Sequence, residues 1–180
     1  AHAPVQDAYA WPDVDRRRKA AVLMAVTDGP RPGIILTERP KTMPSHPGQV
    51  AFPGGRIDPG DADALDAALR EAEEEVGLPR ALVDVVGAVD EFQTGSGYDI
   101  TPILAVVPDD PPLVRNEREV DAIFTAPIDF LFDPANHARQ TVHWAGKPRS
   151  YYEMHWEGHR IWGVTAGIIV NLARRLQWIG

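Results

Sequence analysis

The sequence predicts an α+β fold in which a mixed β-sheet is packed between helices. Short apolar runs typical of strands are interspersed with segments of helical spacing. Glycine and proline supply 15 and 17 of the 180 residues, so turns are frequent and the elements are well separated. The length suits one domain with a substantial core. We therefore expect a single domain over residues 1–180, with an irregular N-terminal segment over 1–19.

Apolar runs bounded by turn residues predict strands in the first part of the chain. The expected strands are residues 20–26, 33–37 and 49–52, and the last of them runs into a glycine turn. Prolines and a glycine within 38–48 indicate a loop, because they forbid a long helix. Four adjacent bases precede the first strand: Arg16, Arg17, Arg18 and Lys19. They could grip an anionic ligand, or they could mark a solvated strand entrance.

The next segment predicts an amphipathic helix that begins near Asp61 and ends at Gly77. Its apolar stripe consists of Leu65, Leu69, Ala72 and Val76. Asp61 suits the N-cap position, because its carboxylate can accept a hydrogen bond from a free backbone N–H. Gly77 suits the position just after the helix, where a left-handed backbone is common.

This helix and the turn before it carry most of the net charge. Between Asp58 and Glu75 lie eight acids and one base, a local charge of −7 in a chain whose total is −8. Spacings of three and four group Glu71, Glu74 and Glu75 on a face turned away from the apolar stripe. Such like charges cost about 0.2–0.5 kcal/mol per pair. A bound divalent cation would reverse that cost, and the alternative is a solvated acidic face.

The second half of the chain predicts further strands, a hairpin and two helices. Strands are expected at residues 83–89, 100–107 and 118–124. Residues 151–155 and 161–162 can pair around a Glu-Gly turn. A short helix is expected over 127–131, and the spacing of Ile168, Leu172 and Leu176 predicts a helix over 165–176.

Composition excludes several classes of function. The acidic balance, with an isoelectric point of about 5.2, gives no support for binding nucleic acid or an anionic membrane. Because there is no cysteine, disulfides, thiol catalysis and thiolate metal sites are excluded. The longest apolar stretches, residues 20–26 and 164–170, are too short to span a membrane. No secretory signal is visible, and we expect a cytoplasmic protein.

The glycine turn and the acidic helix together resemble the signature of the Nudix hydrolases. The matching positions are Gly55, Arg70, Glu71, Ala72, Glu74, Glu75, Gly77 and Leu78. Two departures are visible: the first acid is Asp61 rather than Glu, and eight residues rather than seven separate it from Arg70. The resemblance implies a Nudix-like α/β/α sandwich with a curved mixed sheet, and the acidic helix laid against that sheet.

The resemblance also implies a metal site. Glu71, Glu74 and Glu75, together with the Gly54 carbonyl, would form the metal shell, and Arg70 would pair with Asp61 to fix the turn. Carboxylate and carbonyl oxygens suit Mg²⁺ or Mn²⁺ better than zinc. Such ions neutralise the oxygens of a diphosphate and activate a water molecule for in-line attack.

A further acid usually comes from a downstream loop or strand in this superfamily. Glu119 is the preferred candidate, ahead of Glu117, because it opens the predicted strand over 118–124. A carboxylate there could take the proton of the attacking water. The alternative is that both acids decorate an exposed strand end.

Segments outside the signature resemble the coenzyme A pyrophosphatase branch of the family. The matching segments are residues 35–39, 46–55, 96–98, 101–102 and 162–166. This resemblance implies hydrolysis of coenzyme A or its derivatives to 3′,5′-ADP and 4′-phosphopantetheine. One departure is Pro44, which stands where the branch usually carries an Arg. Rival functions are hydrolysis of ADP-ribose or a dinucleotide, and a non-catalytic nucleotide-binding module.

Candidate substrate-binding residues are Arg39, His46 and Tyr98. A guanidinium recognises phosphate in bidentate fashion, which favours Arg39, although a structural salt bridge is the alternative. Arg39, Lys41 and His46 are the candidates for contact with a 3′-phosphate. Five large aromatic side chains could stack an adenine or line a channel: Tyr98, Tyr151, Tyr152, Trp156 and Trp162. Alternatively, most are core or dimer contacts, so a homodimer is an open expectation beside the nucleotide substrate.

Overall fold

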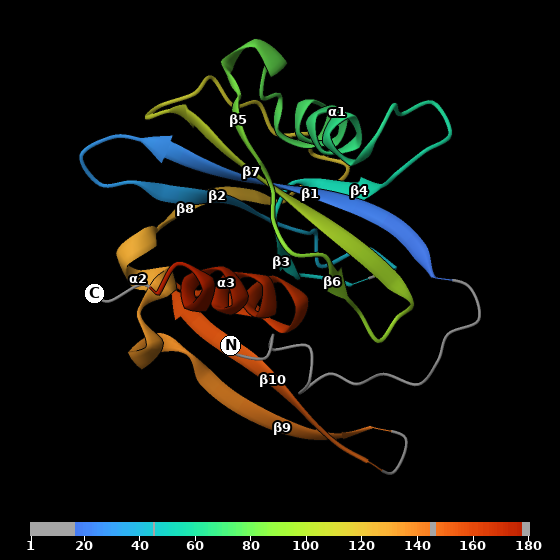
Figure 1. Ribbon diagram of the computed structural model, residues 1–180, viewed down its shortest axis with the longest axis vertical. Coiled ribbons are helices and arrows are strands. Elements are labelled where there is room, and N and C mark those ends of the chain that lie inside the picture. Colours follow the sequence, from blue (N-terminus) through green and yellow to red (C-terminus); the bar gives the residue numbers. More distant parts are fainter. Residues whose placement is uncertain (1–16, 45, 145–146, 178–180) are drawn as a thin grey trace.

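An eight-stranded mixed sheet forms the centre of the molecule (Figure 1). The computed structural model describes residues 17–44, 46–144 and 147–177. The strands of this sheet are β1 (Arg18–Asp28), β2 (Gly33–Glu38), β3 (Val50–Ala51), β4 (Gly54–Arg56), β5 (Asp84–Ala88), β6 (Phe92–Gln93), β7 (Tyr98–Pro108) and β8 (Ala122–Pro127). β1 and β7 run parallel from the Arg18–Tyr98 pair to the Asp28–Pro108 pair, and the other pairings are antiparallel. The predicted mixed sheet is confirmed.

Helices lie on both faces of this sheet. Helix α1 (Ala64–Val76) covers one face, and α3 (Gly163–Arg175) lies on the other, with the short helix α2 (Ile128–Phe132) beside it (Figure 1). A three-stranded antiparallel sheet packs against α3 and consists of β9 (Ala138–Trp144), β10 (Lys147–Trp156) and β11 (His159–Trp162). Short 3-10 turns lie at Arg80–Leu82 and Pro134–Asn136. The predicted α+β sandwich is therefore confirmed.

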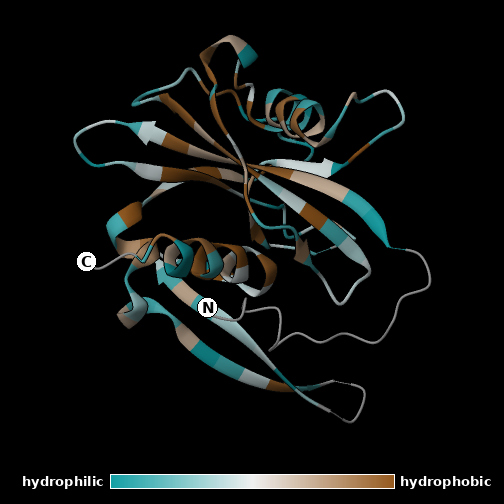
Figure 2. Ribbon diagram, in the orientation of Figure 1, coloured by the Kyte–Doolittle hydropathy of each residue, from teal (hydrophilic) through white to brown (hydrophobic). Residues whose placement is uncertain are grey.

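Alternation along the central strands builds one core on each face of the sheet. On β1, Leu23 packs into the core beneath α1, whereas Met24 packs into the core beneath α3. Both side chains are fully buried. The hydropathy colouring shows the same division, with apolar colour concentrated in the sheet and on α3 and polar colour along β9 (Figure 2). Because the central strands are apolar on both faces, the sheet offers α1 an apolar surface to pack against.

Most predicted elements are confirmed, but two predicted boundaries are wrong and one strand was not predicted. Arg18 and Lys19 belong to β1 rather than to an irregular segment, and residues 1–16 lie outside the described residues. The strand expected over 118–124 begins only at Ala122, because the residues before it form a turn. β9 was missed, since its polar sequence shows no apolar alternation. No helix among the described residues is both long and apolar enough to cross a membrane.

Candidate active site

The ends of α1 are set by two local signals, of which sequence analysis placed one correctly. The N-cap is Asp63, whose side chain accepts from the backbone N–H of Asp66, so the expectation that Asp61 caps the helix is wrong. Gly77 ends the helix in the left-handed conformation with φ 64°, as predicted. Its N–H and that of Leu78 bond to the last turn of the helix. The helix therefore presents its acidic face in a fixed register.

Asp61 instead pairs with Arg70, as the resemblance implied. Arg70 Nε donates to Asp61 Oδ1 at 2.8 Å, and Nη2 donates to Oδ2 at 3.0 Å. The backbone N–H of Asp58 also donates to Asp61 Oδ2, at 2.7 Å. The Arg70 guanidinium, with help from that N–H, lowers the pKa of Asp61 to about 2. This bidentate pair ties the loop before α1 to the middle of the helix.

The glycine turn allows β4 to approach the acidic face of α1. A Cβ added at Gly55 would lie 2.5 Å from Glu71 Oε1, and one at Gly54 would lie 2.5 Å from the Ala21 carbonyl oxygen. Neither position accepts a side chain without moving the backbone or the carboxylate. Gly55 is therefore required by the close packing of β4 against α1, which brings its backbone beside Glu71, and Gly54 is required by the close packing of β4 against β1.

Arg70 also holds two of the predicted metal ligands. Its Nη1 donates to Glu71 Oε1 at 3.0 Å and to Glu74 Oε2 at 3.3 Å. Burial raises the pKa of Glu71, and the Arg70 guanidinium opposes that rise. The Glu74 side chain is 52% exposed. One guanidinium thus offsets part of the charge of three acids, Asp61, Glu71 and Glu74, and orients their carboxylates.

Glu75 is the least compensated of these carboxylates. It is 7% exposed, and its Oε2 accepts one hydrogen bond, from the Gly54 N–H at 3.1 Å. Burial raises the pKa of Glu75 from 4.5 to about 7, because water no longer solvates the charged form. The Gly54 N–H and the charge of Arg39 oppose this rise, whereas Glu71 and Glu119 add to it. A buried carboxylate among like charges favours a cation at this position.

Glu119 lies on the loop that passes beside the C-terminal end of α1. The N–H of Asn116 donates to the Glu75 carbonyl at 2.9 Å, and Asn116 Nδ2 donates to Glu119 Oε1 at 3.2 Å. The N–H groups of Glu119 and Val120 both donate to the Asn116 carbonyl, which closes a turn. Glu119 therefore lies in this turn. The prediction that it opens a strand is wrong, since β8 begins at Ala122. Its charge nevertheless acts on both Glu71 and Glu75.

The donor set of the cluster fits a hard divalent cation, although the side chains are not gathered around one point. Among the described residues, no three His, Asp or Glu side chains form a group that could hold a metal ion as they stand. Arg70 draws Glu71 and Glu74 to itself, and Gly54 holds Glu75. The carboxylates carry oxygen ligands, which Mg²⁺ and Mn²⁺ prefer, and they repel one another without a cation.

The predicted substrate-binding residues lie in different surroundings. Arg39 lies near enough to Glu75 to lower its pKa, and its Nη1 contacts Met43 Sδ at 3.7 Å. His46 is exposed in the loop before β3, with a φ of 51°. Tyr98 lies half-buried at the start of β7, where it contacts Arg18 and Arg56. The structure thus lets the charge of Arg39 act on Glu75 and places Tyr98 with two bases.

Three residues near the site have little or no signal in the sequence. Asn116 carries no signal in the sequence, because its role depends on a loop that meets α1 only in the folded chain. Arg56 follows the glycine turn directly and could have been found as the next residue of β4. Arg18 was noted only as one of four adjacent bases. Of the aromatic candidates, Tyr151, Tyr152 and Trp156 pack against the core beneath α3, as the alternative interpretation expected.

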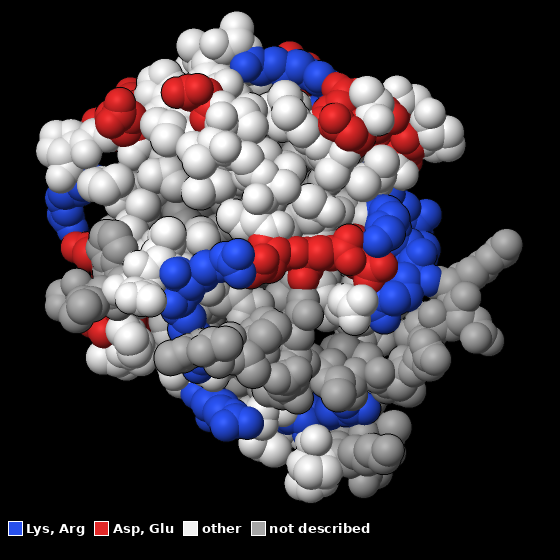
Figure 3. Space-filling model, in the orientation of Figure 1, with Lys and Arg blue, Asp and Glu red and all other residues white. Residues whose placement is uncertain are grey.

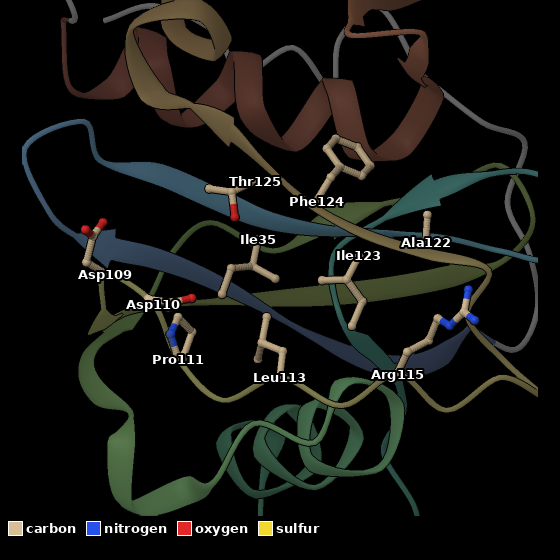
Figure 4. Close-up of a pocket in the computed structure, with 10 residues that line it drawn as sticks. All are labelled: Ile35, Asp109, Asp110, Pro111, Leu113, Arg115, Ala122, Ile123, Phe124 and Thr125. Atoms are coloured by element: carbon tan, nitrogen blue, oxygen red, sulfur yellow. The ribbon is translucent and has the colours of Figure 1, made fainter.

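A groove of about 600 Å³ lies beside α1, on the same face of the sheet (Figure 4). Its floor includes Ile35 and Ile123, and Leu113 lines it from the loop after β7. Asp109 and Arg115 lie at opposite ends (Figure 4). Arg115 directly precedes Asn116, so the groove adjoins the Glu119 loop but does not contain the carboxylate cluster.

Comparison with known proteins gives consistent results. Residues 16–145 match the NUDIX domain family. The chain is 39% identical over 159 residues to the uncharacterized Nudix hydrolase NudL of Escherichia coli K12, which covers 88% of this chain and 83% of the relative. NudL of Cronobacter sakazakii is also 39% identical, over 160 residues, covering 89% and 83%.

Two solved structures show a similar fold. A Nudix hydrolase from M. smegmatis, RenU, superposes with a TM-score of 0.62 at 22% identity, covering 91% of this chain and 88% of that one. The NUDIX domain of Shewanella oneidensis NrtR, solved with ADP ribose, gives a TM-score of 0.50 at 16% identity, covering 70% and 84%. At these identities the likeness concerns the fold.

Proposed function

The chain belongs to the Nudix family of hydrolases, and from that premise we propose that it hydrolyses the diphosphate of coenzyme A or its derivatives. The products would be 3′,5′-ADP and 4′-phosphopantetheine. The observation that carries the proposal is the position of Arg39. This residue ends the coenzyme A-type segment 35–39, and it lies close enough to the Glu75 carboxylate to lower its pKa. The segment that resembles coenzyme A pyrophosphatases therefore ends in a residue whose charge acts on one of the carboxylates that would bind the metal ions.

The carboxylate cluster would hold the metal ions. Nudix hydrolases generally use divalent cations such as Mg²⁺ or Mn²⁺. Glu71, Glu74 and Glu75 would bind them, with the Gly54 carbonyl as a further ligand. When bound, such an ion neutralises diphosphate oxygens and makes water a better nucleophile. Arg70 keeps Glu71 and Glu74 oriented, since its Nη1 donates to both.

Other residues would bind the substrate and move the proton. The Arg39 guanidinium would contact a diphosphate oxygen, because a planar fork of donors matches that geometry. Glu119 would accept the proton of the attacking water. Asn116 Nδ2 donates to Glu119 Oε1 at 3.2 Å, and Glu119 Oε2 would accept the proton. His46, on the exposed loop before β3, would add a donor to phosphate.

Two alternatives remain as candidate functions. One is hydrolysis of ADP-ribose or a dinucleotide, favoured by the fold likeness to a NUDIX domain solved with ADP ribose. The other is a non-catalytic nucleotide-binding module. The burial of Glu75 among like charges argues against that module, because a domain that never binds cations gains nothing from this charge.

Product analysis tests the proposal directly. The purified protein is incubated with coenzyme A, ADP-ribose, NADH or nucleoside triphosphates, with Mg²⁺ or Mn²⁺, and the products are identified by mass spectrometry. We expect the highest kcat/KM for coenzyme A or an acyl derivative, with 3′,5′-ADP released. Higher kcat/KM for ADP-ribose would reject the coenzyme A assignment, and no metal-dependent turnover of any substrate would favour the binding module.

A further inference from the structure

Two arginines converge on the ring of Tyr98. The Arg18 guanidinium carbon lies 4.2 Å from the ring centroid, and that of Arg56 lies 6.0 Å from it. Arg56 Nε also donates to the Tyr98 hydroxyl at 3.2 Å. The three side chains come from the first residue of β1, the last residue of β4 and the first residue of β7. The fold therefore assembles this cluster from residues far apart in the sequence.

Neither Arg18 nor Arg56 forms an ion pair with an acid in the described part of the chain, although the chain is strongly acidic. Their neighbours differ, since Arg17 and Lys19 both pair with Asp99. Basic side chains gather at the end of the sheet where β1 begins (Figure 3). Two exposed guanidiniums around one ring repel each other, and an anion between them would remove that repulsion.

The cluster lies close to the carboxylate cluster but on the other face of the sheet. Gly55 faces Glu71, so the next residue, Arg56, points to the opposite face. The Cα of Arg56 lies two residues along the strand from the Cα of Gly54, a distance of about 7 Å. Among the described residues β4 pairs only with β1, so no strand covers its other edge. A ligand passing around that edge could touch both clusters.

We propose that Arg18 and Arg56, arranged around Tyr98, bind a phosphate monoester, and that in the proposed reaction this group is the 3′-phosphate of coenzyme A. The assignment of that group rests on the proposed function. Both guanidiniums present forked donors, which suit phosphate oxygens. The scissile diphosphate would then lie at the carboxylates, and the 3′-phosphate on the other side of β4.

The test compares two nucleotides that differ only in the 3′-phosphate. Binding of 3′,5′-ADP and of 5′-AMP is measured by isothermal titration calorimetry with EDTA present, so that neither metal nor turnover contributes. We expect 3′,5′-ADP to bind at least about ten- to a hundredfold more tightly, the range for a single charge-assisted contact. Arg56→Ala and Arg18→Ala should each shrink this ratio several-fold. Arg56→Lys, which keeps the charge but loses the fork, should shrink it less.

Controls separate this site from folding defects and from the proposed reaction. Arg31→Ala removes an exposed arginine from the turn between β1 and β2 and should leave the ratio unchanged. Thermal unfolding of each variant verifies that it folds. Equal binding of the two nucleotides by the wild type, or ratios unaffected in both alanine variants, would overturn the site, even if coenzyme A is hydrolysed. A preserved ratio without hydrolysis of coenzyme A would overturn the reaction and leave the phosphate site standing.

Discussion

Replacing Glu75 with Gln should make the metal-free protein more stable while abolishing most of its metal-dependent turnover. The side chain is 7% exposed, and within the described part of the chain a single N–H, that of Gly54, donates to it at 3.1 Å. Gln keeps the size and the acceptor oxygen and removes the charge. Removing the charge also removes its repulsion with Glu71 and Glu119, whose charges act on this position. The substitution therefore removes a buried charge without creating a cavity.

The size of the effect follows from the pKa of Glu75, which burial raises from 4.5 to about 7. Because each tenfold change in proton affinity is worth about 1.4 kcal/mol, the full effect is about 3 kcal/mol. The folded-state pKa lies above the unfolded value, so this contribution to stability is complete below pH 4.5 and is lost as the pH rises through 7. The wild type should therefore lose stability relative to Glu75→Gln as the pH rises from 4.5 to above 7.

Urea unfolding in EDTA at pH 5 and pH 8 measures this difference. At pH 8 the variant should be more stable by up to about 3 kcal/mol, or roughly 6–12 °C in Tm for a chain of this size. Adding Mg²⁺ or Mn²⁺ should stabilise the wild type and leave the variant nearly unchanged. Glu73→Gln is the matched control, because Glu73 is an exposed acid of the same helix. The reasoning is refuted if Glu75→Gln is less stable than the wild type at pH 8, or if it turns over normally.

Three further substitutions test individual roles. Glu74→Gln should abolish most metal-dependent turnover and Glu73→Gln should not, because only Glu74 shares Arg70 with Glu71; kinetics under magnesium titration decide this. Glu119→Gln should lower kcat more than Glu117→Gln, since Asn116 fixes Glu119 whereas the Glu117 side chain is 81% exposed; equal kcat values would contradict it. Arg39→Ala should lower kcat/KM for coenzyme A and for dephospho-coenzyme A alike, by about tenfold or more, because the diphosphate that Arg39 would contact is common to both. A narrowed preference for coenzyme A would instead place the 3′-phosphate at Arg39.

The outcome of the last comparison also decides between two locations for the 3′-phosphate. The sequence predicts candidate contacts in the loop that contains Arg39 and His46. The structure adds a second location at Arg18 and Arg56, on the other face of β4. If the ratio of kcat/KM for coenzyme A to that for dephospho-coenzyme A falls in Arg56→Ala and not in Arg39→Ala, Arg39 contacts the diphosphate alone. The reverse result would return the 3′-phosphate to the loop.

The parts of the site that sequence predicted are those whose signals are local. The apolar stripe of α1 and the left-handed Gly77 are written in adjacent residues, and each is confirmed. The turn of Asn116 was not predictable, because the Asn116 N–H donates to the Glu75 carbonyl, 41 residues away in the chain. The contact between Arg56 and Tyr98 likewise spans 42 residues. Such contacts depend on strand register, which one sequence does not reveal.

The Asp61–Arg70 pair shows why a departure in spacing need not disrupt a site. The extra residue and the shorter side chain would matter if helical periodicity set the distance between the two groups. Asp61 instead lies in the loop before the N-cap residue, Asp63, and its Oδ2 accepts the Asp58 N–H. The loop absorbs the extra residue, and the long Arg70 side chain reaches back to both oxygens. Arg70 Nη2 also donates to the Arg56 carbonyl, so the same guanidinium ties β4, the loop and α1 together. Asp61 and Arg70 therefore pair because the loop places the Asp61 carboxylate within reach of the guanidinium, whatever the number of residues between them.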